Sequence, residues 1–148
     1  TLAWAQESVS AKAMSMLADK AIVSRLTYMD QDILNLILLG KVKFIDAKYN
    51  TQFSLNYELK KSFFCPINDE TVLIHYVGPT KPWHYWAGYP SAQPFIKAKE
   101  ASPWKNEPLM RPVNSNYARY CAKHNFKQNK PINGIMNYIY YFYLKIIK

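Results

Sequence analysis

The fold is decided by the stretch Ile74-His75-Tyr76-Val77-Gly78-Pro79-Thr80-Lys81-Pro82-Trp83-His84 and by the apolar residues that lead into it. Residues 71–77 are β-branched and apolar, and turn-forming residues flank them, so they predict a buried strand that ends at a turn. In open α/β sheets, ligands bind beyond the carboxyl ends of the strands. If this strand belongs to such a sheet, His75 and Lys81 lie near a candidate site at this turn.

Three residue types in this stretch suit an anionic ligand that is held through a metal ion. The imidazole of His75 can supply a metal-ligand nitrogen. Gly78 lets the backbone approach a ligand closely, and Lys81 supplies a positive charge for a phosphate. Each residue also has a structural interpretation, because a histidine can hydrogen-bond at a strand end and a lysine before a proline can be a solvated loop residue.

Size and composition fit a folded globular protein. The chain has 148 residues, of which 49% are hydrophobic and 20% charged, so it can bury a core. No run approaches the roughly 20 apolar residues of a membrane span. Residues 1–7 have neither a basic start nor the apolar segment of a secretion signal, and they lack an initiator methionine. We therefore expect a piece of a longer protein that is not secreted.

The positive charge is concentrated in the C-terminal third. Residues 1–96 carry nine Lys and Arg against eight Asp and Glu, whereas residues 97–148 carry ten against two. Such an asymmetry indicates an anionic partner for the C-terminal region. An anionic membrane surface and a nucleic acid are both open at this point.

The N-terminal residues predict helices. Residues 4–26 have helical spacing, with a break expected near Asp19-Lys20, and a second helix is expected to open at Met29 and to end near Gly40. Residues 41–45 alternate like a strand, and residues 46–59 are expected to be irregular.

The C-terminal residues predict further helices. We expect a short helix over residues 90–101 and a basic helix over residues 119–130, stopped by Pro131. The tail, residues 132–148, is rich in Tyr and Ile. It suits either a terminal helix docked on the domain or the interface of an anionic membrane.

Asp30-Gln31-Asp32 lies where a helix is expected to begin, and it has two interpretations. Carboxylates favour helix N-termini, so Asp30 could simply be the cap. Alternatively, the three polar groups could bind the hydroxyls of a sugar. A cluster of Trp83, Tyr85 and Trp86 likewise suits sugar stacking or core packing.

The cysteines and histidines do not predict a zinc site. Cys65, Cys121, His75 and His84 share no zinc-type spacing. The two cysteines also lie far apart in sequence, so we expect reduced thiols.

Three motifs, taken together, resemble the later motifs of family 8 glycosyltransferases. They occur in the order Asp30-Gln31-Asp32-Ile33-Leu34-Asn35, Tyr49-Asn50, and His75-Tyr76-x-Gly78-x-x-Lys81-Pro82-Trp83. The resemblance continues through residues 97–112 and the Tyr-rich tail, which are similar to the C-terminal extension of bacterial enzymes that add a hexose to the lipopolysaccharide outer core.

The resemblance implies an α/β fold, the C-terminal part of a GT-A type (Rossmann-like) nucleotide-sugar transferase, followed by a mainly helical basic extension. Residues 1–90 would be the C-terminal portion of the catalytic domain and residues 91–148 the extension. The family's earlier half, with its Asp-x-Asp metal motif, has no counterpart in this chain. We therefore expect the 148 residues alone to be inactive.

The resemblance also implies roles for single residues. His75 would be a ligand of Mn²⁺ or Mg²⁺, and Gly78 and Lys81 would contact the donor diphosphate. The residues expected at the donor sugar are Asp30, Gln31, Asp32 and Asn50, with Asp30 and Gln31 as the catalytic candidates and Gln31 nearest the reacting carbon.

The implied activity is retaining α-1,3 transfer of glucose or galactose from a UDP-sugar to the outer-core glucose of lipopolysaccharide. The resemblance places such an enzyme in the cytoplasm of a Gram-negative bacterium, bound peripherally to the anionic inner membrane through residues 97–148, with no nucleic-acid partner. Two alternatives stay open, namely a non-catalytic basic module that binds nucleic acid or an anionic membrane, and a truncated pseudoenzyme.

Overall fold

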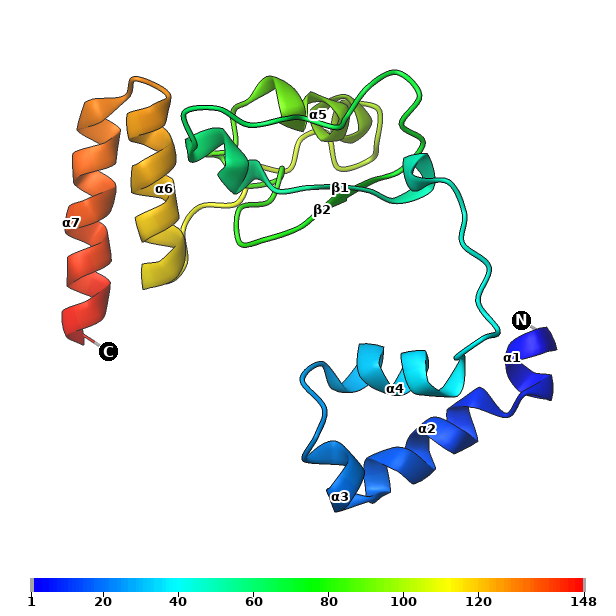
Figure 1. The fold of residues 1–148 in the computed structure, drawn as a ribbon. Helices are drawn as coiled ribbons and strands as arrows, with labels where there is room; N and C mark the ends of the chain where they lie inside the picture. The colour runs from blue at the N-terminus through cyan, green and yellow to red at the C-terminus, as the bar shows by residue number, and fades with distance from the viewer. Residues whose placement is uncertain (1, 148) are drawn as a thin grey trace. The chain divides into compact units, whose positions relative to one another are not determined.

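The structure is a computed structural model that describes residues 2–147. They form two compact units, divided between Ile45 and Asp46, and each unit is described by itself (Figure 1). We call them the N-terminal unit (to residue 45) and the C-terminal unit (from residue 46).

The N-terminal unit is helical, as predicted. The expected break near residue 19 is confirmed, because the Asp19 carboxylate accepts a hydrogen bond from the Ala21 amide at 2.8 Å and caps a new helix. Val9 and Ile33 are the buried side chains among residues 2–45. The helices are α1 (Leu2–Gln6), α2 (Val9–Ala18), α3 (Lys20–Val23) and α4 (Met29–Ile37).

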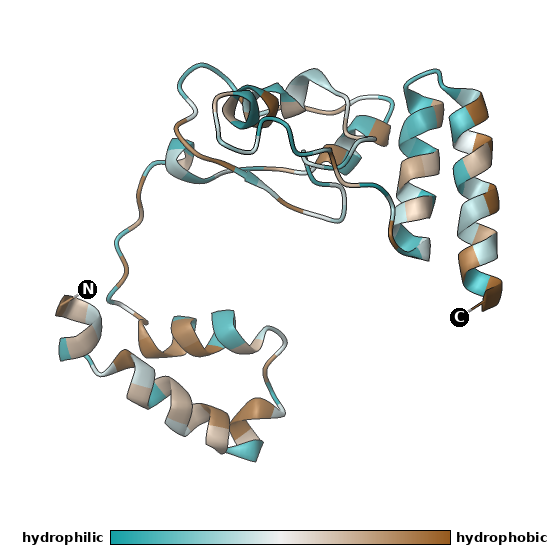
Figure 2. Cartoon of the chain, turned by 180° about the vertical axis from the view of Figure 1, so that it is seen from behind, coloured by the Kyte–Doolittle hydropathy of each residue, from teal (hydrophilic) through white to brown (hydrophobic). Residues whose placement is uncertain are grey.

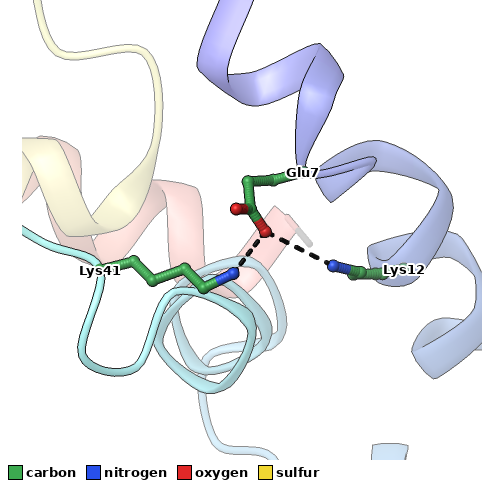
Figure 3. A network of polar contacts seen from close by, with 3 residues as sticks. All are labelled: Glu7, Lys12 and Lys41. Carbon is green, nitrogen blue, oxygen red and sulfur yellow. Dashed lines mark hydrogen bonds and ion pairs between the residues drawn. The ribbon is translucent and has the colours of Figure 1, made fainter.

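A small ionic network ties the ends of this unit together (Figure 3). The Glu7 carboxylate accepts a hydrogen bond from the Lys41 ammonium and lies 3.7 Å from that of Lys12. The strand predicted over residues 41–45 is wrong, since these residues are irregular and Phe44 is 91% exposed. Alternating residues form a strand only when a neighbouring strand takes up their backbone hydrogen bonds, and the described residues of this unit offer none.

The C-terminal unit contains a small parallel sheet of two strands. Strand β1 (Thr51–Phe53) pairs with β2 (Ile74–Tyr76), and Gln52 lies opposite His75. The prediction that residues 46–59 are irregular is therefore wrong for β1 and for the short 3₁₀ helices η1 (Ala47–Asn50) and η2 (Leu55–Leu59).

The predicted strand over residues 71–77 is confirmed only for its last part. Val72 and Leu73 precede β2 and are 63% and 52% exposed, so the apolar run is not fully buried. The α/β prediction is thus confirmed only in part. The described residues contain helices and a parallel sheet, but most of the structure is helical and the sheet has two strands.

A hydrophobic core lies between the sheet and the residues after it. It contains Phe53, Leu55, Ala87, Tyr89 and Ala92, all with at most 8% of their surface exposed. The helix predicted over residues 90–101 is confirmed as η3 (Pro90–Ala92) followed by α5 (Gln93–Glu100).

Two helices complete the unit. The predicted basic helix begins earlier than expected, as α6 (Ser115–Lys127), because the Asn114 side chain caps it by accepting the Tyr117 amide at 2.8 Å. Pro131 follows the end of α6 and is the first residue of α7 (Pro131–Ile147), a position where its missing N–H costs nothing.

Helix α7 packs along α6, so the tail is a docked terminal helix (Figure 1). Its other side carries exposed apolar residues, and Figure 2 shows hydrophobic colour along its length. Within residues 2–147, no helix combines the length and apolar character that crossing a membrane requires.

Candidate functional site

The C-terminal unit places three of the predicted site residues around one cavity of about 720 Å³. Asn50 comes from the end of η1, His75 from β2, and Lys81 from the turn that follows β2. The rest of the lining is largely apolar and includes Leu73, Trp83 and Phe95. The cavity thus lies along β2 and the turn that follows it.

His75 is oriented by Asn50. The His75 Nδ1 and Asn50 Oδ1 atoms lie 3.2 Å apart, and an amide oxygen only accepts, so Nδ1 carries the proton of this bond. The Nε2 lone pair is then free for another partner. A histidine whose second nitrogen is held in this way is the usual arrangement of a metal ligand.

Lys81 is held at the cavity by two contacts. Its ammonium donates to the Tyr76 carbonyl oxygen at 2.6 Å, and its backbone N–H donates to His84 Nδ1 at 3.1 Å. An ammonium has three donors, so the Tyr76 carbonyl occupies one and leaves two for a ligand. Lys81 is therefore an anchored cation rather than a freely solvated one.

Gly78 shapes the turn between β2 and Lys81. Its φ is +81°, which side chains other than glycine rarely adopt, and an added Cβ would lie 2.7 Å from the Ser54 hydroxyl oxygen. The glycine is needed for the turn itself. Whether it also contacts a diphosphate stays a prediction.

A buried histidine network supports the same turn from α6. His124 Nε2 lies 3.1 Å from the Thr80 hydroxyl and 3.1 Å from Asn56 Oδ1, and Nδ1 lies 2.8 Å from the Tyr89 hydroxyl. Burial, reinforced by the charges of His84 and Lys123, lowers the pKa of His124 to about 4. The network is neutral near pH 7. The sequence analysis missed it, since these partners are up to 68 positions apart.

His84 is a second buried neutral histidine. Its ring stacks on Trp86 with centroids 4.2 Å apart, and burial together with the nearby charge of Lys81 lowers its pKa to about 4. Trp86 is 1% exposed and belongs to the core, whereas Trp83 lines the cavity. Of the two interpretations of this cluster, core packing is confirmed for Trp86.

Two further contacts link α6 to the segment after the turn. The Tyr85 hydroxyl lies 3.0 Å from Cys121 Sγ, and the Gln128 side-chain amide donates to the Trp86 carbonyl at 2.7 Å. Both cysteines are free thiols, and burial raises the pKa of Cys121. Helix α6 therefore fixes the segment that carries Lys81.

The remaining predicted residues lie in the N-terminal unit, on α4. Asp30 and Asp32 lie in the first turn, where carboxylates favour a helix, but Tyr28 and not Asp30 is the cap residue. The Asp32 carboxylate accepts the amides of Thr27 and Tyr28 at 2.8 and 2.9 Å. Asp30 and Gln31 are exposed on the first turn. Donor-sugar binding by this group stays a prediction.

The described residues supply a single candidate metal ligand, His75. Among residues 2–147, no three His, Cys, Asp or Glu side chains come together as a ligand set. His75 has the expected arrangement, since its Nδ1 is bound to Asn50 and its Nε2 stays available. A metal ion bound by His75 would need further ligands, and the described residues gather none around it.

The chain belongs to glycosyl transferase family 8. The model of that family matches residues 1–87, and the model of the family 8 C-terminal region matches residues 89–145.

Particular relatives are bacterial lipopolysaccharide enzymes. The chain is 53% identical over 147 residues to the lipopolysaccharide glucosyltransferase WaaO of Escherichia coli K12, covering 99% of this chain and 43% of the relative. It is 51% identical to a lipopolysaccharide 1,3-galactosyltransferase of Salmonella typhimurium, covering 98% and 43% respectively. It is 38% identical to a lipopolysaccharide 1,2-glucosyltransferase of Escherichia coli, covering 96% and 43%.

The chain thus spans about 43% of the length of these curated relatives. No solved structure matches it.

Proposed function

We propose that this chain forms part of a retaining hexosyltransferase that moves glucose or galactose from a UDP-sugar to the outer-core glucose of lipopolysaccharide. The observation that carries the proposal is the cavity that gathers Asn50, His75 and Lys81 in a family 8 chain. Its 53% and 51% identity to a lipopolysaccharide glucosyltransferase and a 1,3-galactosyltransferase supports the substrate class.

The cavity suits the diphosphate of the donor. Lys81 offers two unused ammonium donors to a ligand. Negative charge builds up on the departing diphosphate during transfer, and a fixed cation stabilises that charge better than mobile water does. Because the Tyr76 carbonyl anchors the Lys81 ammonium, the positive charge of Lys81 is already in place before the bond between the sugar and the diphosphate breaks.

His75 would hold a divalent metal, Mn²⁺ or Mg²⁺, through Nε2, with Asn50 keeping the ring in the required tautomer. Such a metal supplies Lewis-acid stabilisation to a leaving diphosphate. In this proposal Asn50 acts through His75 rather than on the donor sugar as the sequence predicted. Asp30 and Gln31 would bind the sugar near its reacting carbon, with Asp32 shaping the start of α4.

The C-terminal region would hold the enzyme at the cytoplasmic face of the inner membrane. Ile135, Ile139, Phe142 and Ile146 recur at helical spacing on α7 and are all more than half exposed. Residues 97–148 supply ten of the 19 basic residues, which favours an anionic surface. An apolar stripe beside basic residues is the pattern of a helix that lies in a membrane interface.

A chimera tests the activity. The 148 residues replace the matching 43% of the Escherichia coli relative, and transfer to lipopolysaccharide from UDP-glucose and UDP-galactose is measured. We expect transfer by the chimera and none by the isolated chain. Lys81→Gln should lower kcat/KM by about 100-fold, the loss typical of one preorganised charge-stabilising donor.

The matched control is Lys61→Gln, an exposed lysine of the same unit, which should leave kcat/KM unchanged. A folded chimera that transfers neither sugar would overturn the proposed function. Transfer by the isolated chain would contradict the prediction that its site is incomplete.

A further inference from the structure

The C-terminal unit has a second cavity, of about 770 Å³, between residues 108–112 and α7. None of its lining residues lines the cavity of Asn50, His75 and Lys81. Resting on the proposed function, we propose that this second cavity binds a phosphorylated sugar of the lipopolysaccharide acceptor. The polar and aromatic residues of its lining include Arg111, Tyr85, Asn133, Asn137 and Tyr140.

Arg111 is the charged group of this cavity. It is exposed, and the ion pairs of the described residues are both formed by Glu7 of the other unit, so no carboxylate in residues 2–147 neutralises Arg111. A guanidinium presents its N–H groups as a planar fork that matches phosphate. Arg111 is thus an exposed guanidinium that lines the cavity without a carboxylate partner, which suits a phosphate group.

The other polar groups suit sugar hydroxyls. The Asn137 amide donates to the Asn133 carbonyl at 2.8 Å and to the Tyr85 hydroxyl at 3.3 Å, so its position is fixed while its side-chain oxygen stays available as an acceptor. Asn133 lies one helical turn earlier, and its exposed side chain makes no hydrogen bond to the described residues. Amides donate and accept at once, as hydroxyl recognition requires.

The apolar part of the lining is aromatic. Tyr85 and Tyr140 contribute ring surface, and ring faces pack against the C–H groups of a sugar while their hydroxyls stay polar. The Tyr85 hydroxyl is already held by Cys121 Sγ at 3.0 Å. The cavity therefore combines fixed aromatic surface, two amides and one cation, the mixture that a phosphorylated sugar needs.

The backbone places this cavity next to the proposed diphosphate cavity. Trp83 lines the first cavity and Tyr85 the second, so their Cα atoms are at most about 7 Å apart. The Met110 amide donates to the Trp83 carbonyl at 2.8 Å, and the Tyr85 amide donates to the Met110 carbonyl at 3.1 Å. This bridge fixes the Arg111 segment beside the donor cavity, where an acceptor must lie.

Direct binding tests the proposal. The probes are core oligosaccharide released from lipopolysaccharide with its phosphates intact and the same oligosaccharide after phosphate removal, titrated calorimetrically into the chain. We expect the phosphorylated probe to bind more tightly. Arg111→Gln should weaken it by about tenfold, as expected for one lost charge-assisted pair.

The variants separate phosphate from sugar recognition. Asn133→Ala should weaken both probes, and Arg111→Gln should leave the dephosphorylated probe unchanged. Lys105→Gln, an exposed lysine that lines neither cavity, is the control for charge and should bind like the unchanged chain. Equal loss from Lys105→Gln and Arg111→Gln, or equal affinity for the two probes, would overturn the proposal.

Kinetics of the chimera distinguish this proposal from the proposed function. Arg111→Gln should raise the KM for acceptor and leave the KM for UDP-sugar unchanged. If the chimera transfers hexose and Arg111→Gln does not alter either KM, the second cavity is not an acceptor site. If the chimera fails to transfer while Arg111 still discriminates the two probes, the proposed function fails and the phosphorylated-sugar site stands.

Discussion

The two units of this chain differ in how they are stabilised. The N-terminal unit buries only Val9 and Ile33 among its described residues, and large apolar side chains such as Phe44 lie at its surface. The C-terminal unit buries an apolar cluster around Phe53 and a network of polar groups around His124. The family model nevertheless matches residues 1–87 across both units.

The comparison shows that two units matched by the same family model can differ in how stably each one folds. Burial of apolar surface is the main favourable term in folding, so a unit with two buried side chains gains little of it. We infer that the N-terminal unit opens readily, whereas the C-terminal unit behaves as a cooperative body. Hydrogen exchange measures the opening of each unit separately in one experiment, because every amide reports on its own unit.

The largest expected difference is in the response to acid. The three histidines of the chain all lie in the C-terminal unit, and burial lowers the pKa values of His84 and His124 to about 4 from an ordinary 6.5. Between these two pH values the unfolded chain binds protons that the folded chain does not. Stability should therefore fall as the pH drops, by about 1.4 kcal/mol per pH unit for each histidine, and level off below pH 4.

Amide exchange of α6 against that of α2, followed from pH 7 to pH 4, checks this prediction after correction for intrinsic rates. His124→Gln should flatten the dependence in α6. His75→Gln, which removes an exposed histidine, should not. An acid response of equal size in both units would show that carboxylates, and not these histidines, control it.

A smaller difference is expected from two glycines with left-handed backbone, one in each unit. Gly78→Ala should destabilise the C-terminal unit by about 2–4 kcal/mol, because its φ of +81° is strained for alanine and the new Cβ meets the Ser54 hydroxyl at 2.7 Å. Gly40→Ala, with φ +74° and no atom within 4 Å, should cost only the strain of about 1–2 kcal/mol.

Urea unfolding with exchange detection measures both costs. The double variant Gly78→Ala with Ser54→Ala removes the hydroxyl and should recover the steric part of the loss. Equal costs at Gly40 and Gly78 would mean that Ser54 moves aside freely, and the turn before Lys81 would then be less tightly built than the structure shows.

The smallest effect is expected at Glu7. The Lys41 ammonium, through a hydrogen bond and its charge, lowers the pKa of Glu7, but Lys12 and Lys41 are exposed and 44% of the Glu7 side-chain surface is accessible. Exposed ion pairs contribute little and are screened by salt. Glu7→Gln should speed exchange at the start of α2 only slightly, and 1 M salt should abolish the difference. A large effect, or any effect in α6, would contradict the division into two units.

The sequence predicted much of the helical structure, and the reasons for the errors are physical. Residues 93–100 form α5 as predicted because flanking prolines and helical spacing mark them locally. Strand β1 was not predicted because its parallel partner lies more than 20 residues away in sequence, and parallel strands are not joined by a short hairpin turn that a sequence would show. Helix α6 starts earlier than predicted because Asn114 caps it, and an asparagine at that position is a signal visible in the sequence.

The candidate site was predictable only in part. Asn50, His75 and Lys81 were singled out in the sequence and line the same cavity, whereas Gly78 does not line it. Asn50, predicted at the donor sugar, hydrogen-bonds His75 instead. The support from His124 depends on contacts between distant segments, which a single sequence does not encode in any local pattern. The roles of Asp30 and Gln31 rest on the resemblance alone and stay predictions.

The contacts of α6 with the turn at Lys81 limit how this chain can be divided. Residues 1–87 and 89–145 match two separate family models, which suggests two modules that could be exchanged between relatives. Yet Thr80 and the Trp86 carbonyl in the first segment depend on His124 and Gln128 in the second. A cut or a recombination at residue 88 would leave these buried partners behind. The two segments can be exchanged separately only between relatives that carry matching side chains at the positions of His124 and Gln128, and otherwise they must be exchanged together.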